Sequence, residues 1–370
     1  MNKEGQIRVL VLVTDYPGIK RKEAHRFVHV RNLVYKNDGI DVTVLNFATK
    51  EDYEYEGIRV ISLQTYKTDK DKYDLLISHQ PNIRQHYRFM RQYGKRFVGF
   101  IFFFHGHEVL RFSKTYPKPY SYVGDFQPNR ILRDLYDIYK LSVWRRYIPK
   151  IIHKSTLFFV SRWMYNEFLN ATRLAPAALK GRYRITYNCV GEPFEKKTYD
   201  ANSEKLFDFV TIRSNLDGSK YAIDIVNELA TNNPEAKFLV IGRGKFFDYN
   251  LRPDNLIWEN RTLNHQEVLE ALNTARCALM PTRTDAQGLM ACEIATYGMP
   301  LITSELPVCH EVFDSFCNVQ MINNESLDIK LLPICELLEK GLPYKKNDIF
   351  FNENTSAYEV EAIKCFFDET

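Results

Sequence analysis

Two carboxylates and a glycine gather around the expected start of a helix in the segment 281–300. The apolar run before this segment indicates a strand that enters a polar turn, and residues 289–297 indicate a helix that a Gly-x-Pro sequence ends. Asp285 is expected in the turn, and Glu293 one to two turns inside the helix. A helix that opens at Gly288 presents unpaired backbone N–H groups and the positive end of its dipole. The segment therefore predicts a site for a phosphate or an electron-rich sugar oxygen.

The same segment also allows a purely structural interpretation. Acids near a helix start are favoured by the helix dipole in proteins that bind nothing there. Short motifs of this kind also occur by chance. Further segments, in chain order, are needed to decide between the two interpretations.

Cations and a histidine follow other expected strands. The strand 207–213 ends at Arg213, and Lys220 lies at the start of the expected helix 219–226. His105 follows the apolar strand 98–104. Ligands of open α/β sheets bind at the carboxyl ends of strands, which favours a functional role for these side chains. The alternatives are solvated surface cations and a hydrogen-bonded structural histidine.

Two glycines also follow expected strands. Gly242 ends the buried-type strand 237–241, and Gly18 ends the turn after the strand 7–13. Either glycine could serve only to turn the chain. The helix after Gly18 is expected to begin near Glu23, and the loop before it holds basic residues at 20–22.

The order and spacing of these features resemble the retaining family-4 glycosyltransferases of the GT-B fold. Asp285 and Glu293 take the places of the two acids in that family's E-x7-E signature, and Glu311 matches a further family glutamate. The family usually reads Glu-Gly-Phe-Gly where this chain reads Asp-Ala-Gln-Gly at 285–288. His105 and Gly106 match a His-Gly-x-Asp turn, with Glu108 in place of the aspartate.

The resemblance implies a role for each candidate. Asp285 would contact the donor sugar, Glu293 the ribose, and Arg213 with Lys220 the donor diphosphate. His105 would contact the sugar from the other domain. The catalytic candidates are thus His105, Asp285, Arg213 and Lys220, and the donor-binding candidates are Gly18, Gly242, Gly288, Leu289, Met290 and Glu293.

By the same resemblance the chain is expected to be a retaining glycosyltransferase of hexosyltransferase type, acting in cell-surface polysaccharide synthesis. The donor would be a nucleotide-sugar, with a UDP-sugar as the commonest family choice, and the acceptor a hydroxyl of a glycan or a lipid-linked molecule. No metal or other cofactor is expected. Two alternatives stay open: a GT-B sugar-nucleotide epimerase, and a non-catalytic GT-B scaffold, which the departures at Asp285 and Ala286 would indicate.

Length and patterning agree with an α/β protein of two Rossmann-like domains with parallel sheets, which in the GT-B fold face a central cleft. The 370 residues are 45% hydrophobic and alternate between strand-like and helix-like segments. The first domain is expected at 1–190, together with a C-terminal helix 354–370 that returns to it. The donor domain is expected at 191–353, with its linker at 191–205.

Composition bears on location and partners. Seven scattered cysteines without a Cys-x-x-Cys motif, and no visible signal peptide, favour a cytoplasmic protein with reduced thiols. The segment 111–154 holds ten Lys or Arg and three Asp, interleaved with aromatic residues. This mixture suits peripheral contact with an anionic membrane, although a solvated helical face is the alternative.

Two other chemistries are not expected. No nucleic-acid-binding module accompanies the basic segment. Asp69-Lys70-Asp71 has the Asp-x-Asp form of a metal site, but it lies in a charged stretch with no strand before it. A solvated turn is the preferred interpretation.

Overall fold

The protein is described here by a computed structural model, which covers residues 6–18, 25–69, 71–126 and 130–368. It forms two compact units. The first unit comprises residues 1–111, 135–189 and 351–370, and the second comprises 112–134 and 190–350.

The first unit is built on an eight-stranded sheet in the order β3-β4-β2-β1-β5-β6-β7-β8. All neighbouring strands are parallel except the β3–β4 pair. The central strands are continuous apolar runs because both faces of a parallel sheet are covered. The strands are β1 (Arg8–Val13), β2 (Asp41–Asn46), β3 (Tyr53–Tyr55), β4 (Ile58–Ile61), β5 (Leu75–His79), β6 (Gly99–Phe104), β7 (Ser155–Phe159) and β8 (Tyr183–Ile185).

Helices follow these strands along the chain. They are α1 (Arg26–Asn37), α2 (Leu63–Thr68), α3 (His86–Tyr93), η1 (Gly94–Arg96), α5 (Arg130–Ile151), η3 (Ile152–Lys154), α6 (Arg162–Thr172), η4 (Pro176–Leu179), η6 (Asn352–Asn354) and α14 (Ser356–Asp368). The helix α5 begins in the second unit and continues into the first. Glu23, where the first helix was expected to begin, lies outside the described residues.

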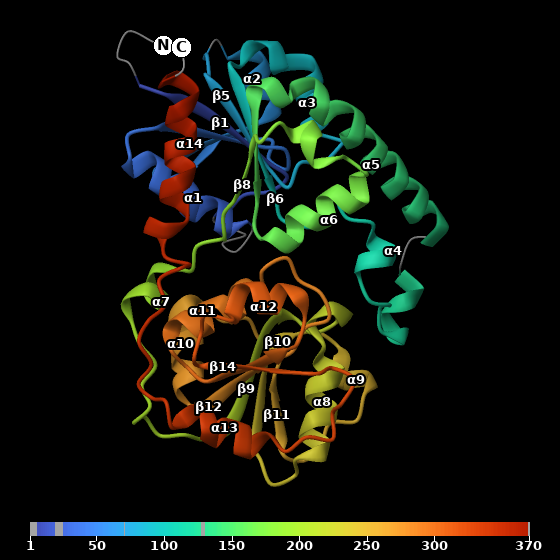
Figure 1. Cartoon of the computed structure of the whole chain (residues 1–370), viewed down its shortest axis with the longest axis vertical. Helices are drawn as coiled ribbons and strands as arrows, with labels where there is room; N and C mark the ends of the chain where they lie inside the picture. Colours follow the sequence, from blue (N-terminus) through green and yellow to red (C-terminus); the bar gives the residue numbers. More distant parts are fainter. Residues whose placement is uncertain (1–5, 19–24, 70, 127–129, 369–370) are drawn as a thin grey trace. The chain divides into compact units, whose positions relative to one another are not determined.

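The C-terminal helix α14 belongs to the first unit, as the sequence predicted. Figure 1 shows α14 beside α1, and the buried carboxylate of Glu359 joins the two helices. The Arg31 Nε atom donates to both Glu359 oxygens, at 2.9 and 3.1 Å. Val360 and Ile363 pack into the same apolar cluster as β1. The last helix therefore completes the core of the first unit.

The second unit is built on a six-stranded parallel sheet in the order β11-β10-β9-β12-β13-β14. Its strands are β9 (Phe207–Asn215), β10 (Phe238–Arg243), β11 (Leu256–Glu259), β12 (Ala275–Met280), β13 (Leu301–Ser304) and β14 (Val319–Ile322). Its helices are α4 (Phe112–Thr115), η2 (Ser121–Phe126), α7 (Glu192–Lys196), η5 (Ser219–Tyr221), α8 (Ile223–Asn232), α9 (Phe246–Tyr249), α10 (His265–Asn273), α11 (Leu289–Tyr297), α12 (Pro307–Phe313) and α13 (Leu331–Glu339).

The segment 112–134 groups with the second unit, whereas the sequence placed it inside the domain 1–190. Its tyrosines explain the difference. The Tyr120 hydroxyl lies 2.8 Å from Asp224 Oδ1, and the Tyr122 hydroxyl lies 2.9 Å from Asp217 Oδ1. Both rings also pack against the apolar cluster of the second unit. We call residues 112–126 the strap.

Candidate functional site

The candidate site of the second unit lies where the strand order reverses. The chain runs from β9 through α8 to β10 on one side of the sheet, while β12 and β13 lie on the other side. Ligands of open α/β sheets bind at the carboxyl ends of strands at such a switch point. Arg213 near the end of β9 and the loop 281–288 after β12 are therefore placed where a ligand is expected.

Arg213 is a buried cation without a carboxylate partner. Its side chain is 8% exposed, and its Nη2 atom donates to the Pro281 carbonyl at 2.7 Å. The Nε atom has no hydrogen-bond partner. Within the described part of the chain, no carboxylate lies within ion-pair distance of this guanidinium. Burial lowers the pKa of Arg213, which the nearby charge of Asp285 partly offsets. A bound anion would supply the missing partner.

Lys220 and Arg213 both stack on the ring of Tyr221. The Lys220 Nζ atom is 4.6 Å from the ring centroid, and the Arg213 Cζ atom is 5.3 Å from it. The sequence predicted a helix from 219, but a short 3-10 turn forms first. Ala222 then takes a left-handed φ of 54° before α8 begins at Ile223.

Arg283 ties the Lys220 turn to the loop after β12. Its backbone N–H donates to the Lys220 carbonyl at 2.9 Å. Its guanidinium holds both carboxylate oxygens of Asp224, at 2.7 and 2.6 Å, and also reaches the Ser219 carbonyl. Two loops that are far apart in the sequence are thereby fixed against each other.

The loop 281–288 is held from beneath by buried polar groups. Thr282 N–H donates to Ser304 Oγ at 2.9 Å, and Asn324 binds both the Ser304 hydroxyl and the Thr282 carbonyl. Asp285 folds back so that its Oδ1 atom accepts the Ala286 N–H at 2.8 Å. The loop is thus anchored before a ligand binds, which reduces the entropic cost of binding.

The helix α11 begins and ends as the sequence predicted. Gly288 (φ 75°) precedes it and Gly298 (φ 85°) follows it, both in the left-handed region that glycine adopts most readily. Leu289 and Met290 are its first residues, and their N–H groups have no acceptor within the helix. Glu293, one turn further, is 5% exposed.

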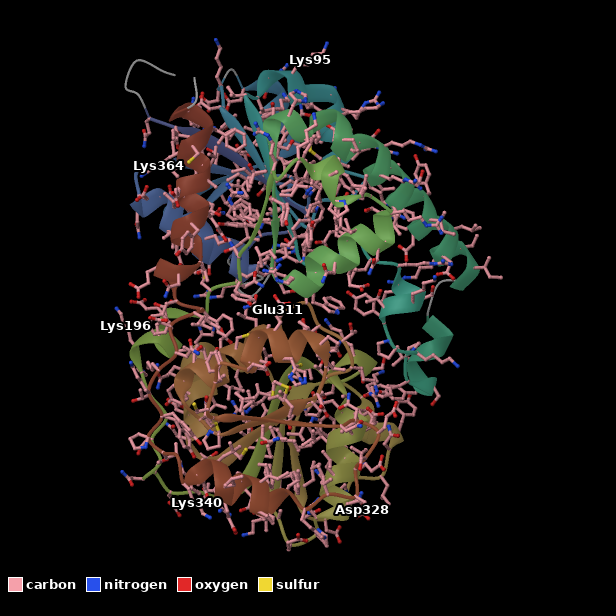
Figure 2. All side chains as sticks on the ribbon, viewed as in Figure 1. Lys95, Lys196, Glu311, Asp328, Lys340 and Lys364 are labelled. Carbon is pink, nitrogen blue, oxygen red and sulfur yellow. The ribbon has the colours of Figure 1, made fainter. Side chains whose placement is uncertain are left out.

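Several candidates line one small pocket. Its volume is about 10 Å³, close to that of one water molecule, and its lining includes Arg213, Asp285, Gln287 and Gly288. A guanidinium, a carboxylate and a helix start thus meet at one place. A diphosphate would bind over this pocket rather than inside it. Glu311, on the neighbouring helix α12, is labelled in Figure 2.

Gly242 is required by packing. A Cβ atom at this position would lie 2.2 Å from the Arg213 carbonyl oxygen and 2.8 Å from Leu216 Cδ2. The glycine therefore lets β10 approach the carboxyl end of β9. Its own carbonyl accepts the Trp258 indole N–H at 3.0 Å.

His105 belongs to the first unit, directly after β6. The carboxylate of Glu108 accepts the N–H groups of His105 and Gly106, so the glutamate closes the turn. The His105 Nε2 atom lies 3.3 Å from His79 Nδ1, and its ring packs on Phe27. Burial and the charge of Arg31 hold the pKa of His105 well below its usual range. Both effects favour the neutral form of the imidazole.

The remaining predicted positions are less informative. Gly18 lies near the Tyr53 ring in the first unit, and residues 20–22 lie outside the described residues. Asp69 and Asp71 both bind the Arg59 guanidinium, at 3.0 and 2.7 Å. Within the described ranges, no group of three or more His, Cys, Asp or Glu is arranged to hold a metal ion.

Sequence reasoning missed Tyr221, Arg283 and Asn324. Tyr221 and Arg283 flank predicted residues, so their position next to Lys220 and Asp285 was the available signal. Asn324 acts through tertiary contacts with residues twenty or more positions away, which no local pattern encodes.

Comparisons with known proteins bear on this geometry. Residues 207–328 match the family model described as glycosyl transferases group 1. Over 142 residues the chain is 34% identical to the O-antigen biosynthesis glycosyltransferase WclY of Escherichia coli. That alignment covers 36% of this chain and 39% of WclY, so it spans well under half of the curated relative.

Solved structures show the fold. A sucrose-phosphate synthase from Thermosynechococcus elongatus superposes with a TM-score of 0.70 at 11% identity, covering 99% of this chain and 100% of that one. WaaG, a glycosyltransferase involved in lipopolysaccharide biosynthesis, gives 0.60 at 13% identity, covering 96% and 99%.

The predicted fold class is therefore confirmed: an α/β protein of two Rossmann-like units with the GT-B fold. The match to the group 1 glycosyltransferase model lies within the second unit. Of the helices in the described ranges, none is both long enough and apolar enough to cross a membrane.

Proposed function

We propose that the protein is a retaining glycosyltransferase that moves a sugar from a nucleotide-diphosphate donor, a UDP-sugar, to a hydroxyl acceptor. The observation that carries this proposal is the buried guanidinium of Arg213, which has no carboxylate partner among the described residues. It shares the Tyr221 ring with Lys220 and lines one pocket with Gly288 at the start of α11. Such a site favours an anion with several oxygens. The group 1 match over the same residues supports a nucleotide-sugar as that anion.

Each candidate has a role in this proposal. Arg213 and Lys220 bind the diphosphate and stabilise the charge that develops as it leaves. The N–H groups at Leu289 and Met290 bind the same group. Asp285 orients the donor sugar and Glu293 binds the ribose. His105, as a neutral imidazole, is a further contact for the sugar, and Gly18 and Gly242 allow close approach of the backbone.

The transfer step needs no enzymatic nucleophile. The acceptor hydroxyl attacks the anomeric carbon from the face of the leaving group, which retains the configuration. The bond from the anomeric carbon to the diphosphate oxygen breaks, and its electron pair stays on that oxygen. The departing diphosphate then accepts the proton of the hydroxyl. The cations of the second unit assist by stabilising the charge on the leaving group.

The proposed acceptor is a hydroxyl of a glycan or a lipid-linked molecule in cell-surface polysaccharide synthesis. WclY is named for O-antigen biosynthesis and WaaG for lipopolysaccharide biosynthesis. Their likeness to this chain supports the setting. A cytoplasmic location follows from that setting, because nucleotide-sugars are the proposed co-substrates.

The helix α5 supports peripheral contact with a membrane. Ile131, Leu135 and Ile138 are 69%, 57% and 49% exposed and recur at helical spacing. An exposed apolar stripe with nearby cations favours an interfacial position. Leu135→Ser/Ile138→Ser should weaken sedimentation with anionic vesicles several-fold, while Leu251→Ser, at a position 91% exposed, should not. Equal sedimentation of both variants would remove this contact from the proposal.

The first test is thermal stabilisation by a panel of nucleoside diphosphates. A ligand at 100 times its Kd stabilises the folded state by about 2.7 kcal/mol. The shift should appear for one base and vanish in Glu293→Gln. Glu336→Gln, an exposed glutamate on α13, is the matched control and should keep the full shift.

The two rival functions give different results. An epimerase would bind the nucleotide and convert the donor sugar without any acceptor. A scaffold would show no shift with any nucleotide, or a shift without turnover. The scaffold function is tested because Asp285 and Ala286 differ from the residues that the family usually has at these positions.

A further inference from the structure

A second hollow lies in the first unit, and none of its lining residues is a catalytic or donor-binding candidate. It has a volume of about 750 Å³ and lies between the edge strand β8 and the helix α14. We call it the basic groove. Its charged and titratable lining residues other than Cys365 and Tyr358 are His153, Lys154, Lys180, Arg182, Arg184 and Glu361.

The positive charge of the basic groove is largely unpaired. Within the described ranges, no carboxylate lies within ion-pair distance of Lys180, Arg182 or Arg184. Arg184 donates only to a neighbouring carbonyl, that of Tyr183 at 3.0 Å. Lys154 differs, because its ammonium donates to the Gly94 and Phe97 carbonyls at 3.1 Å each. Three cations are therefore available to a ligand.

The backbone presents these cations together. Arg182 and Arg184 are two positions apart along an extended segment, so their side chains leave on the same face of the sheet. Lys180 and Gly181 form the preceding turn with left-handed φ values of 49° and 71°. Among the described strands, β8 pairs with β7 alone and lies at the edge of the sheet.

The opposite wall of the basic groove is amphipathic. Tyr358, Ala362 and Phe366 recur on one face of α14, and Phe158 of β7 lines the groove beneath them. The cavity thus joins a cationic side to an apolar side. A ligand that fits both carries a phosphate group next to a less polar body.

The basic groove is distinct from the candidate reaction site. Lys154 and Arg182 come just before β7 and β8, at the amino ends of these parallel strands. His105 follows the carboxyl end of β6. The lining of the groove belongs to the first unit and shares no residue with the pocket of the second unit, so the two sites are built from separate residues.

We propose that the basic groove is a second anion-binding site, which binds a phosphate-bearing ligand through Lys180, Arg182 and Arg184. Guanidinium groups bind phosphate oxygens in pairs, which makes arginine the favoured residue for this recognition. The shared chemistry is a phosphate or diphosphate group, either free in solution or on a lipid headgroup.

The test is calorimetric titration of the full chain with inorganic pyrophosphate. Pyrophosphate also suits the donor site, so the titration is made in a Lys220→Ala background. The double substitution Arg182→Gln/Arg184→Gln should weaken binding at least about tenfold, as expected for the loss of charge-assisted hydrogen bonds. Arg252→Gln/Lys340→Gln, two exposed cations of the second unit, is the charge-matched control and should stay within twofold.

A second arm separates the two sources of phosphate. Vesicles of phosphatidylcholine with and without phosphatidylglycerol are sedimented with the same variants. If the groove variant Arg182→Gln/Arg184→Gln loses pyrophosphate binding alone, the ligand is a free phosphate compound. If the same variant loses vesicle binding, the ligand is a lipid headgroup. Arg182→Lys/Arg184→Lys should restore part of the binding, which shows that charge rather than folding is measured. Groove variants that bind both probes as the parent does, or a parent that binds neither probe, would overturn the proposal.

Discussion

Arg213 and Lys220 differ in how much of the fold depends on them. Arg213 is buried and bonded to the Pro281 carbonyl, so its removal also disturbs packing. Lys220 is half-buried, and its ammonium lies over the face of the Tyr221 ring. Lys220→Ala is therefore the cleaner test of diphosphate stabilisation.

Lys220→Ala should lower turnover about 10²–10³-fold, as does loss of one oxyanion donor in other enzymes. The measurement is release of the nucleoside diphosphate in the presence of acceptor. Lys237→Ala, an exposed lysine before β10, is the control and should retain full activity. Turnover of Lys220→Ala within threefold of wild type would show that the lysine does not act on the leaving group.

His86 makes the stability of the first unit depend on pH. It is fully buried and bonded to the Ser78 hydroxyl at 2.8 Å, and burial lowers its pKa to about 3. In the unfolded chain His86 is protonated as the pH falls below about 6.5. In the folded chain it is protonated only near pH 3. Stability therefore falls as the pH falls through this window, by up to about 1.4 kcal/mol per pH unit.

The check is the melting temperature between pH 7 and pH 5. Over this range the Tm of His86→Gln should fall less than the Tm of the wild type, because glutamine does not titrate. His310→Gln, at an exposed position on α12, should follow the wild-type slope. Equal slopes for all three proteins would mean that His86 is protonated equally in both states.

At the scale of elements, the strap is held to the second unit by both the rings and the hydroxyl groups of its tyrosines. The Tyr122 ring stacks on Tyr249 at a centroid distance of 4.6 Å and an interplanar angle of 4°. Its hydroxyl shares Asp217 with the backbone N–H of Lys245, in the loop that follows β10. The strap is thus bonded to the same loops that carry the donor candidates.

Tyr120→Phe/Tyr122→Phe should loosen the strap without removing its ring contacts. Each lost hydrogen bond to a carboxylate is worth about 1.5–3 kcal/mol. Amide hydrogen exchange over the described strap should rise, while the β9 and β12 amides stay protected. Tyr249→Phe keeps the stacked ring and is the control. Unchanged exchange in the double variant would mean that ring packing alone holds the strap.

The sequence predicted the bounds of individual helices and strands better than it predicted which of them pack together. The helix 289–297 was predicted to the residue, because glycine at both ends and an apolar run between them are local signals. The apolar runs also predicted the two strands that precede the other candidates: β6 ends at Phe104 as expected, while β9 continues two residues beyond Arg213, to Asn215. The strap was not placed correctly, because the tyrosines were read together with the lysines and arginines around them. The structure separates them: Trp144 is buried, Tyr120 and Tyr122 are half-buried against the apolar cluster of the second unit, and part of α5 is exposed.

The basic groove and the contact between His105 and His79 could not be predicted from the sequence either. The groove combines the turn before β8 with α14, and these segments meet only after the chain has folded. His79 ends β5 and His105 follows β6, so their contact depends on which strands are neighbours. Lone histidines after strands give no signal of that kind.

At the scale of the whole molecule, an ion pair between Arg31 and Glu359 joins the N-terminal and C-terminal parts of the chain. Their ion pair is 0% and 1% exposed and joins residues 328 positions apart. Arg31 also donates to Asn188 at 3.0 Å, and Tyr35 donates to the same glutamate. The first unit is thus built from both ends of the chain, so its stability depends on residues that follow the whole second unit.

Glu359→Gln should destabilise the first unit by about 3–5 kcal/mol, because it leaves the Arg31 guanidinium buried without a counter-charge. The unfolding of the first unit, followed by hydrogen exchange of β1 and β5, should shift to lower urea. Glu361→Gln, on the exposed face of the same helix, should leave it unchanged. Arg31→Met/Glu359→Leu removes both charges and should recover much of the loss, since an apolar pair can replace a buried ion pair. A Glu359→Gln protein as stable as wild type would show that α14 is held by its apolar face alone.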